Sequence, residues 1–92
     1  MTVVLEPIRV LIVDDHDMLR EGLSTFLRAF PDMRLVGEAA NGAEAVQRCR
    51  ELAPDVVLMD LIMPEMDGVA AIRAINAAPS RPAIIALSSF GE

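Results

Sequence analysis

Four short apolar runs, separated by stretches with helical periodicity, are the feature that most constrains the fold of this 92-residue chain. They lie at residues 8–13, 33–39, 56–59 and 83–87. Their length and the turn-forming residues around them favour buried strands over helices. Strands that alternate with single helices predict right-handed crossovers and a mainly parallel sheet, so we expect an α/β fold. The second run mixes polar with apolar residues, which is typical of an edge strand.

Three amphipathic segments fill the gaps between these runs. Acidic residues from Asp14 to Asp17 indicate the start of the first helix, and Pro31 indicates its end. Asn41, followed by Glu44, resembles a capping box before the second helix, which ends at Pro54. The third helix is expected to begin at Asp67 or Gly68. The side chains expected to face the core are Leu19, Leu23, Phe26, Leu27 and Phe30 in the first helix, Val46, Cys49, Leu52 and Ala53 in the second, and Val69, Ile72 and Ile75 in the third.

Composition excludes several classes of function. The net charge of −6 argues against a grip on a nucleic-acid backbone, which requires a basic surface. A single cysteine, Cys49, allows no internal disulfide, and its place on a helical apolar stripe predicts a core residue. The first residues lack the basic region of a signal peptide, and no apolar stretch is long enough to span a membrane. We therefore expect an intracellular, cytoplasmic protein.

Polar side chains follow the predicted strands at their carboxyl ends. Asp14 and Asp15 come directly after the first strand, Asp60 ends the third, and Ser88 follows the fourth. All parallel strands deliver these ends to one edge of the sheet, so the three carboxylates converge if the first and third strands are neighbours. Clustered carboxylates repel one another, and a divalent cation relieves that repulsion. Mg²⁺ is the cation expected, because it is commonly held by one or two carboxylates together with water and phosphate.

Other chemistries fit the sequence less well. Neither a P-loop nor a dinucleotide-binding glycine pattern occurs, and one cysteine with one histidine cannot form a zinc cluster. A Ser-His-Asp triad could draw on Ser88 and His16, but neither lies in a nucleophile-elbow sequence. The acids could also be purely structural, as helix caps or the start of a loop, and an exposed His16 is more often solvated than a ligand. Acids at the ends of two separate strands favour phosphoryl transfer onto a carboxylate, with Asp60 as nucleophile.

Four segments together resemble the receiver domain of two-component response regulators, of the NarL/LuxR type. They are residues 10–20 (VLIVDDHDMLR), 35–42 (LVGEAANG), 55–68 (DVVLMDLIMPEMDG) and 84–90 (IIALSSF). This resemblance implies a flavodoxin-like three-layer sandwich with strand order 2-1-3-4 for the strands present. It also implies a signalling module and not an enzyme, which accepts a phosphoryl group from a sensor histidine kinase with Mg²⁺ bound.

The resemblance also implies roles for individual residues. Asp60 matches the phospho-accepting aspartate, and Asp14 and Asp15 match the acidic pair that binds the metal together with Asp60. The backbone carbonyl of Ile62 matches a further metal ligand, and Ser88 matches the switch hydroxyl. A magnesium-dependent phosphatase or phosphotransferase with an aspartyl-phosphate remains a rival hypothesis from a different functional class.

One departure from the family is large. Receiver domains continue after the fourth strand with a helix, a fifth strand bearing a lysine and a last helix, whereas this chain ends at Glu92 and all eight of its basic residues are arginines. We therefore expect an incomplete receiver domain over residues 1–92, with residues 1–7 as an N-terminal extension. A DNA-binding helix-turn-helix domain of a transcriptional regulator would lie beyond residue 92.

The uncovered fourth strand has consequences of its own. Its apolar edge predicts a homodimer or a domain swap through residues 83–87. The alternative function is therefore a fragment that is not competent for phosphorylation and acts only as an assembly module.

Overall fold

A computed structural model describes residues 6–60, 68–79 and 81–87 of the chain, and the statements below concern these residues. The strands are β1 (Ile8–Val13), β2 (Met33–Ala39), β3 (Val56–Asp60) and β4 (Ala83–Leu87), and the helices are α1 (Asp17–Arg28), α2 (Gly42–Leu52) and α3 (Gly68–Asn76). All strand pairs are parallel, in the order β2-β1-β3-β4. The predicted α/β fold and strand order are confirmed.

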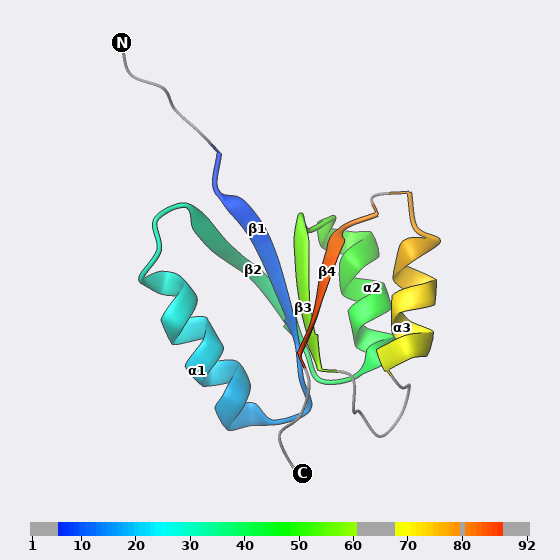
Figure 1. Cartoon of the computed structure of the whole chain (residues 1–92), viewed down its shortest axis with the longest axis horizontal. Helices are drawn as coiled ribbons and strands as arrows, with labels where there is room; N and C mark the ends of the chain where they lie inside the picture. Colours follow the sequence, from blue (N-terminus) through cyan, green and yellow to red (C-terminus); the bar gives the residue numbers. More distant parts are fainter. Residues whose placement is uncertain (1–5, 61–67, 80, 88–92) are drawn as a thin grey trace.

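The helices cover both faces of the sheet, which makes three layers. Figure 1 shows α1 on one face and both α2 and α3 on the other. This arrangement follows from the single helix in each parallel crossover, since each strand must return to the same end of the sheet before the next one begins. No helix among the described residues is both long and apolar enough to cross a membrane.

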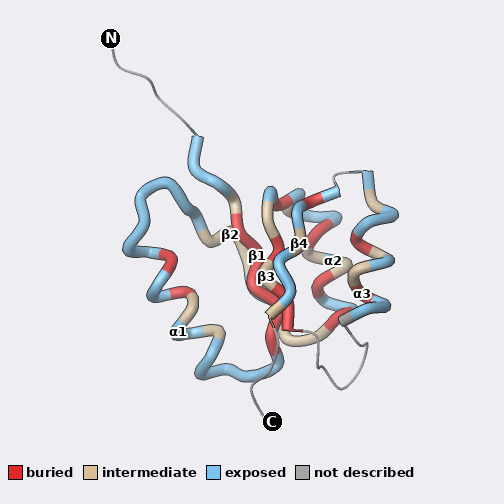
Figure 2. Tube along the Cα trace, in the orientation of Figure 1, coloured by how far each residue is buried: buried red, intermediate tan, exposed pale blue. Residues whose placement is uncertain are grey.

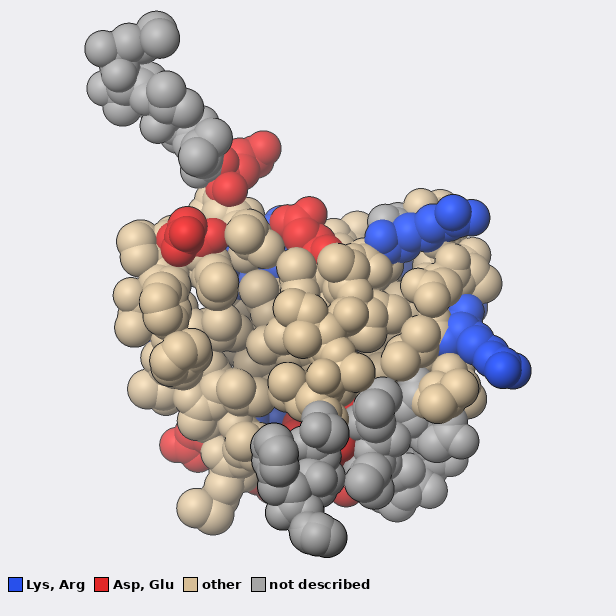
Figure 3. All heavy atoms as spheres, in the orientation of Figure 1, with Lys and Arg blue, Asp and Glu red and all other residues tan. Residues whose placement is uncertain are grey.

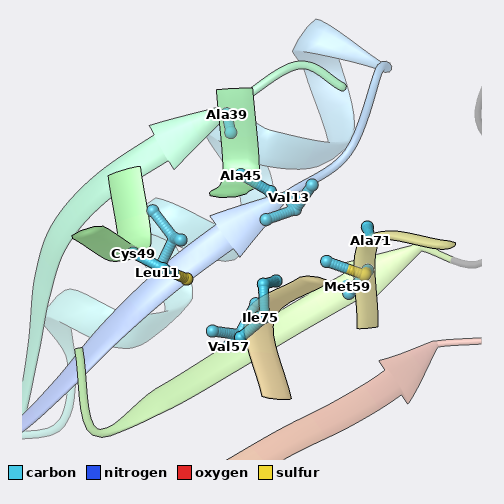
Figure 4. Packing of buried hydrophobic residues seen from close by; sticks show 9 residues of the cluster. All are labelled: Leu11, Val13, Ala39, Ala45, Cys49, Val57, Met59, Ala71 and Ile75. Atoms are coloured by element: carbon cyan, nitrogen blue, oxygen red, sulfur yellow. The ribbon is translucent and has the colours of Figure 1, made fainter. Parts of the chain in front are cut away.

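The main core lies between the sheet and the α2–α3 layer. Figure 4 shows its nine buried residues, which come from four elements on this side and from Ala39 at the end of β2: Leu11, Val13, Ala39, Ala45, Cys49, Val57, Met59, Ala71 and Ile75. Cys49 is 1% exposed, which confirms its predicted core position, and burial raises the pKa of its thiol. Figure 2 shows the same concentration of buried residues along the central strands.

The opposite face is covered less completely. Its cluster contains only Val10, Ile12 and Leu27 as buried residues, and the partly buried Leu23, Leu35 and Leu58 pack against it. The prediction that Leu19, Phe26 and Phe30 face the core is wrong, since these side chains are 47%, 60% and 38% exposed. Helix α1 contacts the β1–β2 half of the sheet through Leu23 and Leu27, so the rest of its apolar stripe points away from the sheet. Phe26 and Phe30 instead pack edge to face, with ring centroids 5.0 Å apart.

Two further core assignments are wrong. Val69 is 57% exposed, and Ala71 takes the buried place on α3 together with Ile75. Ala53 is exposed because it caps α2 in the left-handed conformation (φ 46°), where the chain turns toward Pro54. At the other end of α2 the predicted cap is confirmed for Asn41, whose Oδ1 accepts from the Glu44 N–H at 2.9 Å. Glu44 Oε1 accepts from the N–H of Ala40 at 2.9 Å, one residue earlier than in a standard capping box.

Candidate functional site

The adjacent central strands β1 and β3 bring their terminal acids to the same edge of the sheet. Val13 is paired with Met59 in the parallel register, so Asp14 and Asp60 follow side by side. The backbone N–H of Asp14 donates to the Ala39 carbonyl at 3.0 Å, which also ties this position to the end of β2. Asp14 is 1% exposed and Asp60 is 5% exposed. The carboxylates of Asp14 and Asp60 are therefore both buried, side by side, at the carboxyl ends of β1 and β3.

Asp15 and His16 complete this group. One ligand atom from each of Asp14, Asp15, His16 and Asp60 lies within 4.8 Å of all the others. The structure thus brings together the three acids that sequence analysis placed at one edge, and we call these four residues the acidic cluster. Asp15 keeps a partly exposed side chain (30%), so the cluster opens to solvent on this side.

His16 is more closely attached to the acids than its exposed position suggests. Its Nδ1 lies 2.9 Å from Asp14 Oδ1 and 3.1 Å from Asp15 Oδ1, although 66% of its side chain is exposed. The hydrogen bond with Asp14, and then the charges of Asp15 and Asp14, raise the pKa of His16 above 6.5. Asp14 Oδ1 also accepts from the His16 N–H at 2.7 Å, as in an Asx-turn. The sequence position of His16 predicts a solvated side chain, whereas the Asp two residues earlier is the signal that indicates this turn.

Arg20 is a further residue at the site that sequence analysis did not identify. It lies in the first turn of α1, and its guanidinium donates to the backbone carbonyl of Asp14 at 2.5 Å. It also pairs with the carboxylate of Asp17 and lies 3.4 Å from Glu38 Oε1 on β2. The spacing of three between Asp17 and Arg20 indicated the first pair, but nothing local indicated the other two contacts.

The donor set fits a hard divalent cation. Carboxylate oxygens are the protein ligands of Mg²⁺, which binds one or two of them and keeps several waters. Asp14 and Asp60 could offer oxygens from the interior, and Asp15 could offer one beside solvent, where waters have access. Ile62 and Ser88, the other two predicted site residues, lie outside the described residues.

Comparison with known proteins gives the family. The model of the response regulator receiver domain matches residues 10–92. The transcriptional regulatory protein LiaR of Bacillus subtilis is 53% identical over 83 residues, which are 90% of this chain and 39% of LiaR. The response regulator protein VraR of Staphylococcus aureus is 46% identical over 85 residues, covering 92% of this chain and 41% of VraR. The chain thus spans about two fifths of the length of these relatives.

Solved structures agree with this result. The signal receiver domain of the putative response regulator NarL from Mycobacterium tuberculosis superposes with a TM-score of 0.87 at 34% identity, covering 96% of this chain and 71% of that one. A structure of the P1 domain of CheA3 in complex with CheY6 from R. sphaeroides contains a chain with a TM-score of 0.77 at 38% identity, covering 92% of this chain and 66% of that one. With the parallel sheet and the acids at its carboxyl edge, these matches establish that the chain belongs to the response regulator receiver domain family.

Proposed function

We propose that this chain is the phospho-accepting receiver of a transcriptional response regulator and that Asp60 takes a phosphoryl group from the phosphohistidine of a sensor histidine kinase. The observation that carries the proposal is the buried Asp60 at the end of β3, within 4.8 Å of the Asp14 and Asp15 carboxylates. The complex of CheY6 with the P1 domain of CheA3 supports the class of partner. The names of LiaR and VraR support a role in regulation.

The proposed reaction transfers phosphorus from nitrogen to oxygen. A carboxylate oxygen of Asp60 attacks phosphorus in line, the bond from phosphorus to the histidine nitrogen breaks, and an acyl phosphate forms on Asp60. Burial fixes the attacking oxygen by restricting the Asp60 side chain. Asp14, Asp15 and Asp60 would hold Mg²⁺, with the carbonyl of Ile62 as a further ligand, and the ion would supply positive charge to the transferring group. Ser88 would donate a hydrogen bond to a phosphoryl oxygen.

The consequence of transfer is a local change of charge. An acyl phosphate places nearly two negative charges and three acceptor oxygens where one carboxylate stood. Contacts with these oxygens would bias the surface beyond β4. In the proposed regulator this change reaches DNA through a helix-turn-helix domain that follows residue 92.

The test is labelling of the 92-residue chain by a small phosphodonor, such as acetyl phosphate, with Mg²⁺ or with a chelator. We expect label on the wild-type chain with Mg²⁺ and none on Asp60→Asn, an exchange of nearly equal volume. The rate is expected to be low, because the family lysine has no counterpart among these 92 residues. Equal labelling of wild type and Asp60→Asn would contradict the role of Asp60, and a wild-type chain without label would favour the alternative below.

The second candidate function is assembly through β4. Among the described strands, β4 pairs with β3 alone, and Ile85 on it is 51% exposed. Figure 3 shows charged side chains mainly around the rim of the face that carries β4, and few over the described part of its centre. A strand edge of this kind can pair with a second chain, which would give a homodimer or a domain swap.

Light scattering over a range of concentrations tests this candidate. We expect association of the wild-type chain and a shift toward monomer in Ile85→Lys, which places a charge on the exposed strand. Thr25→Lys, which adds the same single charge at an exposed position on α1, serves as the control for charge alone. A wild-type chain that stays monomeric at every concentration would exclude assembly through β4.

A further inference from the structure

Arg20 connects three parts of the chain that meet at the acidic cluster. Its Nη1 donates to the carbonyl of Asp14 at the end of β1, and its Nη2 pairs with Asp17 at the start of α1. Its Nε lies 3.4 Å from Glu38 on β2. The side chain is 17% exposed, which is unusual for an arginine on a surface helix. A small hollow of about 140 Å³, lined by Arg20, Glu38 and Glu44 among others, lies next to it.

A helix-stabilising pair alone would not explain this arrangement. Arg48 makes the same type of pair with an acid three residues away on its own helix, at 3.0 Å from Glu51, and its side chain is 41% exposed. Such exposed pairs contribute little to stability. Arg20 differs from Arg48 in its burial and in its reach to a backbone carbonyl and to another strand. Because of these two differences, Arg20 can restrain the loop at the acidic cluster as well as stabilise its own helix.

The contact with the Asp14 carbonyl fixes the peptide that joins Asp14 to Asp15. The N–H of Asp14 is already bonded to Ala39, so the second contact restrains the residue from both its amide and its carbonyl side. Asp15 is partly exposed, and its side chain direction depends on this peptide. Loss of the Arg20 contact would leave Asp14 held by its N–H and His16 held by the Asp14 carboxylate, but it would free the peptide that sets the direction of the Asp15 side chain.

The charge of Arg20 is balanced where it sits. Asp17 and Glu38 both lie against its guanidinium, so the side chain can orient the loop without adding net positive charge beside a bound cation. The planar guanidinium has five donors and can serve three acceptors in fixed directions, whereas a lysine ammonium on a flexible stem cannot reproduce that geometry. The arrangement therefore requires arginine in particular.

We propose that Arg20 is a positioning residue for the acidic cluster, which holds the loop of residues 14–16 in the geometry that binds the divalent cation. This inference rests on the proposed function, because it assumes that Asp14, Asp15 and Asp60 bind Mg²⁺. It assigns to Arg20 no contact with the phosphoryl group or with the metal.

The experiment compares Arg20→Met, Arg20→Lys and the matched control Arg48→Met with the wild-type chain. Two quantities are measured: amide hydrogen exchange of residues 14–17 without metal, and the Mg²⁺ dissociation constant by calorimetry. Arg20→Met should speed exchange in the loop but not at Val57 in the core, and should weaken Mg²⁺ binding by about 10- to 100-fold, as is typical for groups that orient a metal ligand. Arg20→Lys should restore little of the affinity, and Arg48→Met should change neither quantity.

Each other outcome overturns a defined statement. Unchanged loop exchange, or faster exchange with unchanged Mg²⁺ affinity, overturns the positioning role while the proposed function stands. Wild-type affinity for Mg²⁺ in Arg20→Lys also overturns the positioning role. If Arg20→Met does not fold, Arg20→Lys alone decides whether Arg20 has this role. A wild-type chain that binds no Mg²⁺ overturns the metal site of the proposed function and the role of Arg20 with it.

Discussion

The two ends of β3 each carry an aspartate, and the two aspartates are used differently. Asp55, just before the strand, is exposed, and its carboxylate accepts the backbone N–H of Arg9 at 2.9 Å. Its own N–H donates to the Arg9 carbonyl, and its carbonyl accepts from Ala83. Asp60, at the other end, is buried and lies among other acids. Two acids five positions apart thus serve strand pairing at one edge of the sheet and a cluster of charges at the other.

The difference arises from the direction of the strands. In a parallel sheet the amino ends meet at one end of the sheet, where here the backbone groups of Arg9 on β1 and Ala83 on β4 bond with Asp55. The carboxyl ends of the strands meet at the opposite end of the sheet, where loops lead into helices and side chains from separate strands converge. An acid beside a strand therefore indicates a functional site only when it lies at the carboxyl end of that strand.

The largest expected effect concerns Mg²⁺ and thermal stability. A ligand at about 100 times its dissociation constant adds about 2.7 kcal/mol to the free energy of unfolding, which raises Tm by about 10 °C or more in a domain of this size. Scanning calorimetry should show this rise in wild type and Asp55→Asn but not in Asp15→Asn. A rise of the same size in Asp15→Asn would remove that residue from the metal site.

Asp55 should contribute to the stability of the fold but not to the binding of Mg²⁺. Asp55→Ala removes the acceptor of the Arg9 N–H, and a hydrogen bond at such an exposed site is worth about 1 kcal/mol. Urea unfolding should show a loss of this order, with the Mg²⁺-dependent rise in Tm unchanged. If the variant instead lost its response to Mg²⁺, the two edges would not be independent.

The smallest effect is expected from His16 in the metal-free chain. Its pKa is raised by Asp14 and Asp15, so the protonated form is favoured by folding. Its contribution to stability is fully present below the unfolded pKa of about 6.5 and is lost as pH rises through the higher folded value. Because the chain has one histidine, an NMR titration of its ring is unambiguous. Asp14→Asn should lower this pKa toward 6.5, whereas Asp55→Asn should leave it; a pKa that is equal in all three proteins would exclude the observed contact in solution.

Local patterns in the sequence predicted well what local interactions determine. The cap of Asn41 on the Glu44 N–H involves residues three apart, and the strands follow from short apolar runs with turn signals. Convergence of Asp14, Asp15 and Asp60 followed from parallel topology with β1 beside β3. These features need no knowledge of individual side-chain conformations.

Features that depend on tertiary packing could not be predicted in the same way. Helical periodicity marks an apolar stripe but does not say how much of it a sheet will cover, so Phe26 and Val69 were assigned to the core although both are exposed. The contacts of Arg20 with Asp14 and Glu38 join residues on different elements and depend on the conformation of a long side chain. The sequence alone carries no pattern for such a contact.

The central claim is that Asp60, among the clustered acids, accepts the phosphoryl group. Borohydride reduces an aspartyl phosphate to homoserine, so mass spectrometry of the trapped and digested chain locates the acceptor directly. After incubation with acetyl phosphate and Mg²⁺, the account predicts homoserine at position 60 and unmodified aspartate at positions 14, 15 and 55. Homoserine at one of those three positions, with Asp60 unmodified, would contradict it.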